Sequence, residues 1–301
     1  MSIDKLIGCI KEKGNPTVAG LDPKLDFVPG FIVREAFEKH GKGFKGAAEA
    51  ILTFNKGLID ELHEVVPAVK PQSAYYEMYG WEGVRVLEET IQYAKSKGLY
   101  VIADVKRNDI GTTAQAYAQA YLGTTVIGGE PTAAFDADSA TVNGYLGTDG
   151  ITPFTASGKS IFVLVKTSNP SSGELQDLSL GDVTVYEHMA DLVNKWGAES
   201  VGENGYSNVG AVVGATYPEQ LASLRGRMPR AYFLVPGYGA QGGKAEDVAK
   251  AFNSDGLGAI INASRSIMCA YQKQGADEVD YAACARKEAE NMRDDIRRYM
   301  V

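Results

Sequence analysis

The chain predicts a (β/α)8 barrel, because short apolar runs alternate about eight times with longer amphipathic segments. Its 301 residues are 45% apolar and 23% charged, an ordinary globular composition that can form a large core. No Pro/Ser-rich linker or shift in composition divides the chain, so we expect residues 1–301 to form one barrel domain with loop insertions. The surplus over the roughly 250 residues typical of such barrels falls near 28–46, 123–138, 144–158 and 196–207.

The expected strands are short apolar runs, most of which lead into a polar residue or a glycine. They cover 17–21, 68–69, 99–103, 139–143, 161–165, 209–213, 232–235 and 258–262. Apolar residues at helical spacing predict helices at 2–13, 47–65, 80–97, 113–122, 184–196, 218–225 and 280–299. We expect 31–45 to be a mixed, charged connection and 144–158 to be a Gly/Thr-rich loop interrupted by Pro153.

The third strand ends in a cluster of charged residues. Asp104 and Lys106 are two residues apart, so they point to the same side of a strand, and Asp109 follows just before the next helix. A structural salt bridge with Asp109 as a helix N-cap is the simpler interpretation. However, barrel enzymes place their chemistry at the carboxyl ends of strands, and this position favours a functional role.

Two other strand ends carry charged residues. Asp22 follows the first strand and precedes Pro23, where it suits a turn or a hydroxyl acceptor equally well. Lys70 ends the second strand, where a lysine usually reaches for water, but here it occupies a position equivalent to that of Asp104 and Lys106. After the fifth strand, the polar segment 167–173 is either a lid or base-recognition loop or a solvated connector.

Glycines after the seventh strand predict a phosphate site. Residues 237–242 read G-x-G-x-x-G, but they lie too late in the chain for a Rossmann fold, and the next strand ends in Asn262 rather than an acid. In a barrel, glycines at this place let backbone N–H groups approach an anion. Arg265, just after the eighth strand, adds a cation that can bind phosphate through two hydrogen bonds.

The composition excludes several other classes of protein. The formal net charge of −8 argues against a nucleic-acid-binding surface. Three scattered cysteines, Cys9, Cys269 and Cys284, form no metal motif and suit a reduced, cytoplasmic environment. The first residues show no signal segment, and no apolar run reaches the ~20 residues needed to span a bilayer. We therefore expect no metal and no membrane association.

The chain resembles the orotidine 5′-monophosphate decarboxylase family. The residues that carry the resemblance are 104–111 (DVKRNDIG), 236–243 (PGYGAQGG), 265–267 (RSI), 20–23 (GLDP) and 68–71 (AVKP). Segments 142–147 (VNGYLG) and 165–170 (VKTSNP) resemble its longer-chain bacterial-type subfamily. Val105 and Gly144 depart from the usual Ala and Pro, beside the residues that would act.

The resemblance implies a cofactor-free decarboxylase that works as a homodimer with shared active sites. Lys106 would protonate the pyrimidine carbon, within a charge network of Lys70, Asp104 and the partner subunit's Asp109. The other implied contacts are with the substrate. They are Asp22 and Lys70 with the partner subunit's Thr113 at the ribose, Ser168 at the pyrimidine, and Gln241 and Arg265 at the phosphate, within a phosphate site that includes Pro236, Gly237, Gly239 and Ser266.

Two rival functions remain open. Metal-dependent phospho-sugar lyases or decarboxylases share the third-strand signature, but as a family they tend to have an acid where Lys70 stands, which argues against them. A non-catalytic nucleotide-binding or regulatory protein is the other rival. The presence of Lys70, Asp104, Lys106 and Asp109 together argues against it, since such charges are costly to gather without a use.

Overall fold

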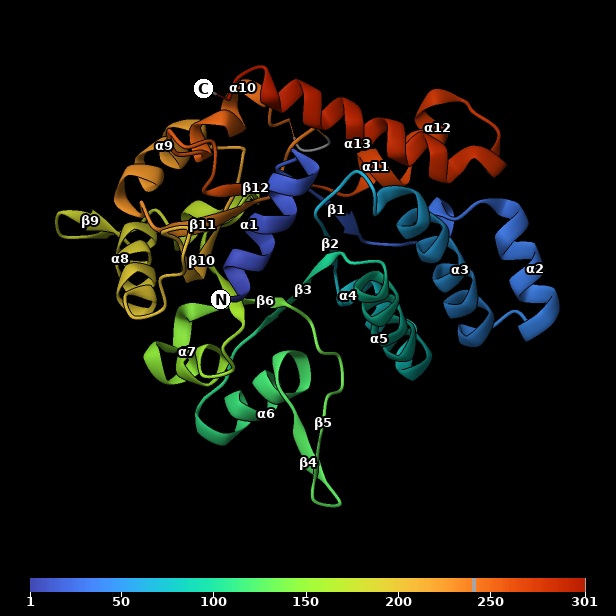
Figure 1. Ribbon diagram of the computed structural model, residues 1–301, viewed down its shortest axis with the longest axis horizontal. Helices are drawn as coiled ribbons and strands as arrows, with labels where there is room; N and C mark the ends of the chain where they lie inside the picture. Colours follow the sequence, from blue (N-terminus) through green and yellow to red (C-terminus); the bar gives the residue numbers. More distant parts are fainter. Residues whose placement is uncertain (240–241, 301) are drawn as a thin grey trace.

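The computed structural model describes residues 1–239 and 242–300, in which eight parallel strands close into a barrel. The strands are β1 (Thr17–Leu21), β2 (Ala68–Pro71), β3 (Tyr100–Arg107), β6 (Ser139–Val142), β7 (Ser160–Lys166), β10 (Ser207–Val213), β11 (Ala231–Val235) and β12 (Ala259–Ala263). Their order around the barrel is that of the chain, and β1 pairs with β12 to close it (Figure 1). The predicted (β/α)8 fold is confirmed.

Helices surround the barrel (Figure 1). They are α1 (Ser2–Lys13), α2 (Gly30–His40), α3 (Phe44–Leu62), α4 (Ala74–Glu77), α5 (Gly80–Ser96), α6 (Gly111–Leu122), α7 (Thr148–Thr155), α8 (Val185–Gly197), α9 (Pro218–Arg227), α10 (Ala245–Val248), α11 (Arg265–Met268), α12 (Ala270–Gln274) and α13 (Tyr281–Arg297). Short 3-10 turns lie at Leu25–Phe27, Gly144–Leu146, Pro170–Glu174, Ala249–Ala251 and Glu278–Asp280.

Two of the expected irregular segments are helical, so these predictions were wrong. The segment 31–45 contains most of α2. Most residues of this helix are not buried, and only Ile32 and Ala36 form its buried side, so the apolar pattern is weak. The segment 144–158 contains α7, which runs through Pro153 even though proline lacks the N–H that would bond to the carbonyl of Asp149. The insertion at 123–138 forms a hairpin of β4 (Thr125–Ile127) and β5 (Glu130–Thr132).

The core has two parts. The larger part lies between the outer face of the barrel and the helices, and the smaller fills the barrel interior with side chains that include Tyr100, Phe162 and Tyr232. Helix α1 belongs to the smaller part, because Ile3, Leu6, Ile7 and Ile10 are buried against the interior residues. Each such aliphatic side chain stabilises the fold by about 1.5–3 kcal/mol. Helix α1 therefore plugs the amino-terminal end of the barrel.

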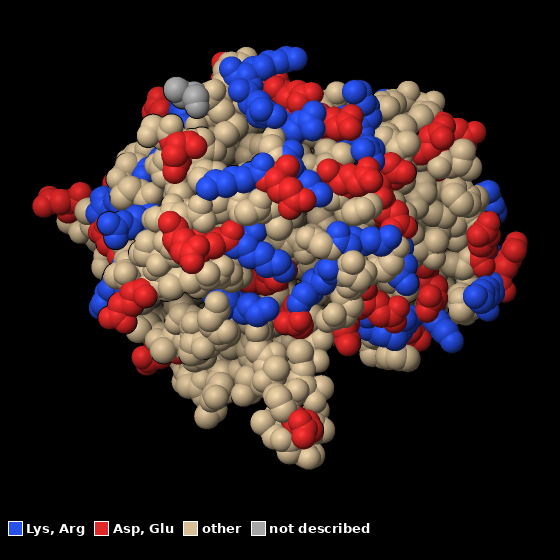
Figure 2. All heavy atoms as spheres, viewed as in Figure 1, with Lys and Arg blue, Asp and Glu red and all other residues tan. Residues whose placement is uncertain are grey.

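The surface carries both signs of charge. On the face viewed in Figure 1, basic and acidic side chains are interspersed, and the protruding β4–β5 hairpin is mostly uncharged (Figure 2). A second hairpin has strands of only two residues each, β8 (Ser179–Leu180) and β9 (Val183–Thr184). Across residues 1–239 and 242–300, no helix has the length and apolar character needed to cross a membrane.

Candidate active site

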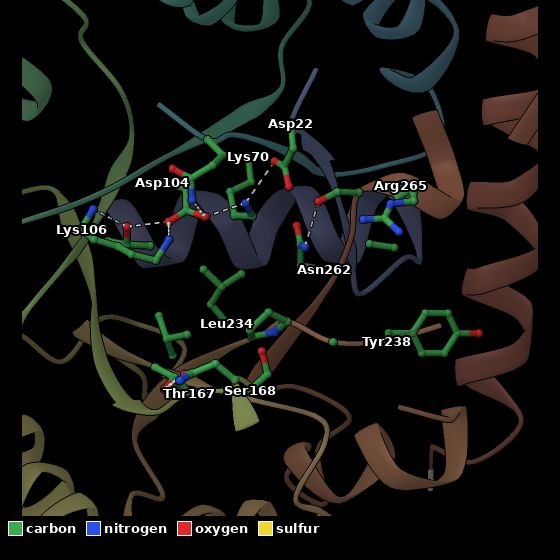
Figure 3. A pocket seen from close by; sticks show the side chains of 18 of the residues that line it. Asp22, Lys70, Asp104, Lys106, Thr167, Ser168, Leu234, Tyr238, Asn262 and Arg265 are labelled. Atoms are coloured by element: carbon green, nitrogen blue, oxygen red, sulfur yellow. Dashed lines mark hydrogen bonds and ion pairs between the residues drawn. The ribbon is translucent and has the colours of Figure 1, made fainter. Parts of the chain in front are cut away.

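The carboxyl ends of the strands surround a cavity of about 590 Å³. Side chains from β2, β3, β6, β7, β10, β11 and β12 reach it, together with the loops that follow β1, β7 and β11. This is the end of the barrel where the sequence placed its charged residues. Of the predicted site residues, the cavity brings together Asp22, Lys70, Asp104, Lys106, Ser168, Pro236, Gly237 and Arg265 (Figure 3).

Asp104 is the centre of the charged wall. One carboxylate oxygen, Oδ2, accepts hydrogen bonds from Lys70 Nζ at 2.7 Å and Gln72 Nε2 at 3.1 Å. The other, Oδ1, accepts from Lys106 Nζ at 2.6 Å and Thr141 Oγ1 at 2.8 Å. Four donors thus satisfy one buried carboxylate, which is the condition for keeping such a charge out of water.

The electrostatics of this wall keep both partners charged. Burial opposes ionisation of Lys70, but the negative charges of Asp104 and Asp22 outweigh that effect and raise the pKa of its ammonium group. Burial likewise opposes ionisation of Asp104, but Lys70 and Lys106 outweigh it and hold the pKa of the carboxyl group well below its usual value. At neutral pH the wall is an array of alternating charges.

Lys106 stands on a distorted part of β3. Ala103 pairs with Ala140 and Arg107 with Val142, so three residues of β3 lie opposite the single Thr141 of β6. Lys106 itself has φ of +46°, a left-handed conformation that costs a non-glycine residue about 1–3 kcal/mol. On this irregular strand end, the Lys106 ammonium group lies 2.6 Å from Asp104 Oδ1 at the cavity, so the two side chains lie together as the sequence predicted.

An apolar wall faces the charged one. Leu164, Val212 and Leu234 come from the neighbouring strands β7, β10 and β11 and line the cavity. Figure 3 shows Leu234 between the charged residues and Thr167–Ser168. A flat ring could lie on these side chains with its edge directed at Lys106. Charges act more strongly beside such an apolar surface than through bulk water.

On the β1 and β12 side, two buried acceptors are unpaired. Within the described chain, Asp22 Oδ1 and Asn262 Oδ1 have no hydrogen-bond partner. Lys70 Nζ lies 3.6 Å from Asp22 Oδ1, beyond hydrogen-bond distance, while Asn262 Nδ2 donates to Ser264 Oγ at 3.3 Å. Gly20 makes room here, because a Cβ atom would lie only 1.9 Å from Ser264 Oγ. Such orphaned acceptors suit the hydroxyl groups of a ligand.

The predicted phosphate site lies beside these acceptors. Gly237, Gly239 and Gly242 have φ of +104°, +69° and +96°, conformations that glycine adopts without strain. Pro236, Gly237 and Arg265 line the cavity. Gly239 and Ser266 are not among the described lining residues, and the predicted contact Gln241 lies outside the described residues.

The segment after β7 forms another side of the cavity. Thr167, Ser168 and Asn169 line it, so the segment is more than a connector. Gln176 fastens it by accepting a hydrogen bond from the backbone N–H of Thr167 at 3.0 Å and donating to its hydroxyl at 2.7 Å. The buried Lys166 pairs with Asp177 at 2.7 Å, which holds the far end of the segment.

Asp109 and Thr113 lie apart from this cavity. As far as the described residues show, neither lines it, and Thr113 is exposed on α6. Asp109 Oδ1 accepts a hydrogen bond from the adjacent backbone N–H of Ile110 at 2.8 Å. Within this chain, therefore, the charged cluster contains Asp104 and Lys106 but not Asp109.

The sequence and the fold were compared with known proteins. Residues 51–278 match the model of the orotidine 5′-phosphate decarboxylase / HUMPS family. This chain belongs to that family. It is 42% identical over 273 residues to the orotidine 5′-phosphate decarboxylase of Caldicellulosiruptor bescii, covering 89% of this chain and 90% of the relative. The corresponding enzyme of Rhodopirellula baltica is 42% identical over 301 residues, covering 97% and 98%.

A solved structure shares the fold. The UMP synthase of Leishmania donovani has a TM-score of 0.76 and 34% identity. The likeness covers 99% of this chain and 56% of that longer one, so this chain corresponds to just over half of it.

One of the rival functions requires a set of metal ligands. In residues 1–239 and 242–300, no three His, Cys, Asp or Glu side chains are grouped so that they could hold a metal ion. The carboxylates of the cavity are paired with lysines instead: Asp104 contacts both Lys70 and Lys106. The donor set therefore suits an array of charges better than a divalent cation.

Sequence reasoning missed several residues of this family member's site. Gln72 and Thr141 hold Asp104, and Asn262 offers an acceptor. Each carried a weak signal, because each stands at or near the carboxyl end of a predicted strand. Tyr238 was missed as a support: its hydroxyl donates to Asp295 Oδ2 at 2.8 Å and ties the glycine-rich loop to α13.

Proposed function

We propose that this protein decarboxylates orotidine 5′-monophosphate to uridine 5′-monophosphate without a cofactor, in pyrimidine nucleotide synthesis. One observation carries the proposal: the Lys70–Asp104–Lys106 array faces an apolar wall, and a glycine-rich loop with Arg265 lies at the other end of the same cavity. The family and the names of its relatives support the same reaction.

The reaction needs what the charged wall offers. Breaking the C6–carboxylate bond releases CO₂ and leaves an electron pair on C6, in the ring plane, where no carbonyl group can delocalise it. Without a cofactor as electron sink, the protein must stabilise this charge electrostatically. Lys106 Nζ, which Asp104 Oδ1 holds at 2.6 Å, then donates a proton to C6.

The rest of the cavity would hold the nucleotide. Leu164, Val212 and Leu234 would pack against the pyrimidine, with Ser168 bonded to its edge. The ribose hydroxyls would reach Asp22 and Lys70. Arg265 would bind the phosphate together with the site formed by Pro236, Gly237, Gly239, Gln241 and Ser266. Binding energy from the phosphate can be used to orient the distant reacting carbon.

The active site would be shared between two subunits. The charge array in one chain lacks Asp109, which lies in the turn before α6, and the ribose side lacks Thr113, which lies on α6. We infer that the partner subunit's Asp109 and the partner subunit's Thr113 complete the site in a homodimer. The apolar side chain of Ile110, next to Asp109 in the chain, is 60% exposed, which supports burial by a second copy.

The first test is turnover of orotidine 5′-monophosphate, followed by loss of the orotate absorbance with and without EDTA. Turnover that persists in EDTA is expected. Loss of turnover in EDTA, restored by Mg²⁺, would favour the metal-dependent phospho-sugar class. Absence of turnover by folded protein would favour the regulatory interpretation.

The second test mixes two inactive variants. Lys106→Ala and Asp109→Ala should each be inactive alone, yet a heterodimer contains one site in which Lys106 and Asp109 are both intact. After subunit exchange, an equal mixture should regain about a quarter of the wild-type activity, since half of the dimers each contain one complete site. No recovery despite demonstrated exchange would mean that Asp109 acts within its own subunit or not at all.

A further inference from the structure

Thr141 lies directly opposite the bulge that carries the reactive lysine. The β3–β6 register brings three residues, Asp104 to Lys106, against Thr141 alone. A bulge of this kind leaves backbone N–H groups without partners in the ladder. Thr141 is buried, and its side chain lines the floor of the cavity beside Asp104.

The Thr141 hydroxyl supplies what the bulge lacks. Its oxygen accepts hydrogen bonds from the backbone N–H groups of Val105 and Lys106, each at 3.0 Å. Its hydrogen is donated to Asp104 Oδ1 at 2.8 Å. A hydroxyl group has one donor and two acceptor sites, so these three bonds to residues 104–106 use all of its hydrogen-bonding capacity.

We propose that Thr141 is a positioning residue for the decarboxylation, and that its hydroxyl fixes both the backbone and the charge partner of Lys106. This inference rests on the proposed function. One atom joins the N–H of Lys106, whose backbone is held at φ of +46°, to the carboxylate that binds the Lys106 ammonium at 2.6 Å. The Thr141 hydroxyl therefore holds the backbone of Lys106 directly and its ammonium group through Asp104.

This arrangement matters because the Lys106 side chain is otherwise free to move. It is 44% exposed, and four rotatable bonds separate its backbone from its ammonium group. General acid catalysis depends on the proton lying within hydrogen-bond reach of the reacting carbon. An unsupported bulge would let the strained backbone relax and carry the ammonium group away from that position.

Among the proposed substrate-binding groups, Lys70 is linked to Thr141 through Asp104, and the others stand apart from it. Arg265, Ser168 and Asp22 stand on other elements, and in the described part of the chain the hydroxyl of Thr141 bonds only to Asp104, Val105 and Lys106. Loss of the hydroxyl should therefore lower kcat and leave KM nearly unchanged. A residue with only a structural role would instead lower thermal stability while leaving the kinetic constants of the folded fraction intact.

The experiment compares three variants with the wild type. Thr141→Val keeps the shape and removes the hydroxyl, and Thr141→Ser keeps the hydroxyl. Thr17→Val is the matched control, because the buried Thr17 hydroxyl on β1 donates to Asn15 Oδ1 at 2.8 Å and does not line the cavity. The measurements are kcat and KM for orotidine 5′-monophosphate, the Kd of uridine 5′-monophosphate by calorimetry, and Tm.

We expect Thr141→Val to lower kcat by about 10- to 100-fold, since it leaves buried groups without partners, with KM and Kd within about threefold of wild type. Thr141→Ser should recover most of kcat, and Thr17→Val should match the wild type in kcat. If the valine variant does not fold, Thr141→Cys takes its place, because a thiol is a weak donor and acceptor. It should then show an intermediate loss of kcat.

Three outcomes would overturn the inference. They are a wild-type kcat in Thr141→Val, an equal loss in the serine and valine variants, and a change confined to KM. Turnover by the wild-type protein is decided first and separately. If the wild type does not turn over orotidine 5′-monophosphate, the proposed function fails and the inference falls with it; if only the variant pattern differs, the function stands and the role of Thr141 fails.

Discussion

The two sides of the cavity differ in how complete they are. On the β2, β3 and β6 side, both oxygens of Asp104 are occupied by donors from the protein itself, namely Lys70, Gln72, Lys106 and Thr141. On the β1 and β12 side, Asp22 Oδ1 and Asn262 Oδ1 are buried without a donor from the described residues. One side is closed and the other is open.

The difference separates two tasks of the site. A closed network holds its geometry before any ligand arrives, which is what electrostatic preorganisation requires. Open acceptors are destabilising until a ligand supplies the missing donors, so they contribute to binding and to discrimination among ligands. Changes on the closed side should therefore act on kcat, and changes on the open side should act on KM.

The sharpest way to break the closed side is Lys106→Ala. It removes both the charge near the developing carbanion and the proton donor, so kcat should fall by about 10,000-fold or more. Lys106→Arg is the matched variant: it keeps the charge, but a guanidinium group does not release its proton, so it should also remain far below wild type. A kcat near the wild-type value in either variant would contradict the assigned role.

Arg265→Ala tests the far end of the open side. It removes the cation expected to bind phosphate, so KM should rise by about 100-fold, with a smaller fall in kcat. Arg265→Lys should lie between this variant and the wild type, because it retains the charge but not the two parallel hydrogen bonds. Steady-state kinetics measure both constants, and an unchanged KM would place the phosphate elsewhere.

Asn262→Ala tests the open side at its neutral acceptor, the side-chain amide of Asn262. It removes an acceptor that has no partner in the described structure and also the 3.3 Å hydrogen bond from Nδ2 to Ser264 Oγ, so the free energy of unfolding should fall by no more than about 1 kcal/mol, while KM rises by about 5- to 10-fold. Urea denaturation and steady-state kinetics together give the answer. A loss of stability with no change in KM would mean that the residue serves the fold and not the ligand.

Asp4→Asn supplies the baseline, because Asp4 lies on α1 at the opposite end of the barrel. Burial raises the pKa of Asp4, but hydrogen bonds from Asn204, the amino terminus and the backbone of Glu203 outweigh it and lower that pKa from 3.8 to about 2. A carboxyl group whose pKa is lowered on folding stabilises the protein above its unfolded pKa. This contribution is lost as the pH falls through the folded pKa.

The variant should therefore lower the free energy of unfolding at pH 7 by about 1 kcal/mol. The difference from wild type should shrink as the pH falls from about 4 to about 2, and kcat and KM should not change. Urea denaturation at several pH values measures this, and a constant difference across that range would contradict the assigned cause.

The sequence predicted the barrel strands well because each is a short apolar run that the barrel buries on both faces. It did less well with α2, since only Ile32 and Ala36 on that helix are buried and its pattern is weak. It missed α7 because Pro153 was taken as a break, whereas the helix runs through that proline without its backbone hydrogen bond.

The site was predictable to the extent that its residues share a strand or a motif. Asp104 and Lys106 follow from the two-residue period, and Lys70 from its equivalent position. Thr141 and Asn262 could not be singled out, because their importance depends on which residues the neighbouring strands bring opposite them. The bulge in β3 and the left-handed φ of Lys106 leave no signature in a single sequence, because they arise from that same pairing.

The packed interior of the barrel, with the plug of α1 beneath it, makes the site a cup that opens at one end only. Ile3, Leu6, Ile7 and Ile10 close the lower end, and the same helix lies behind the pocket in Figure 3. In the proposed reaction, substrate, nucleotide product and CO₂ must then share one mouth. The proton that restores Lys106 must arrive by that route as well. Release of the product through this opening therefore also admits the water from which Lys106 regains its proton.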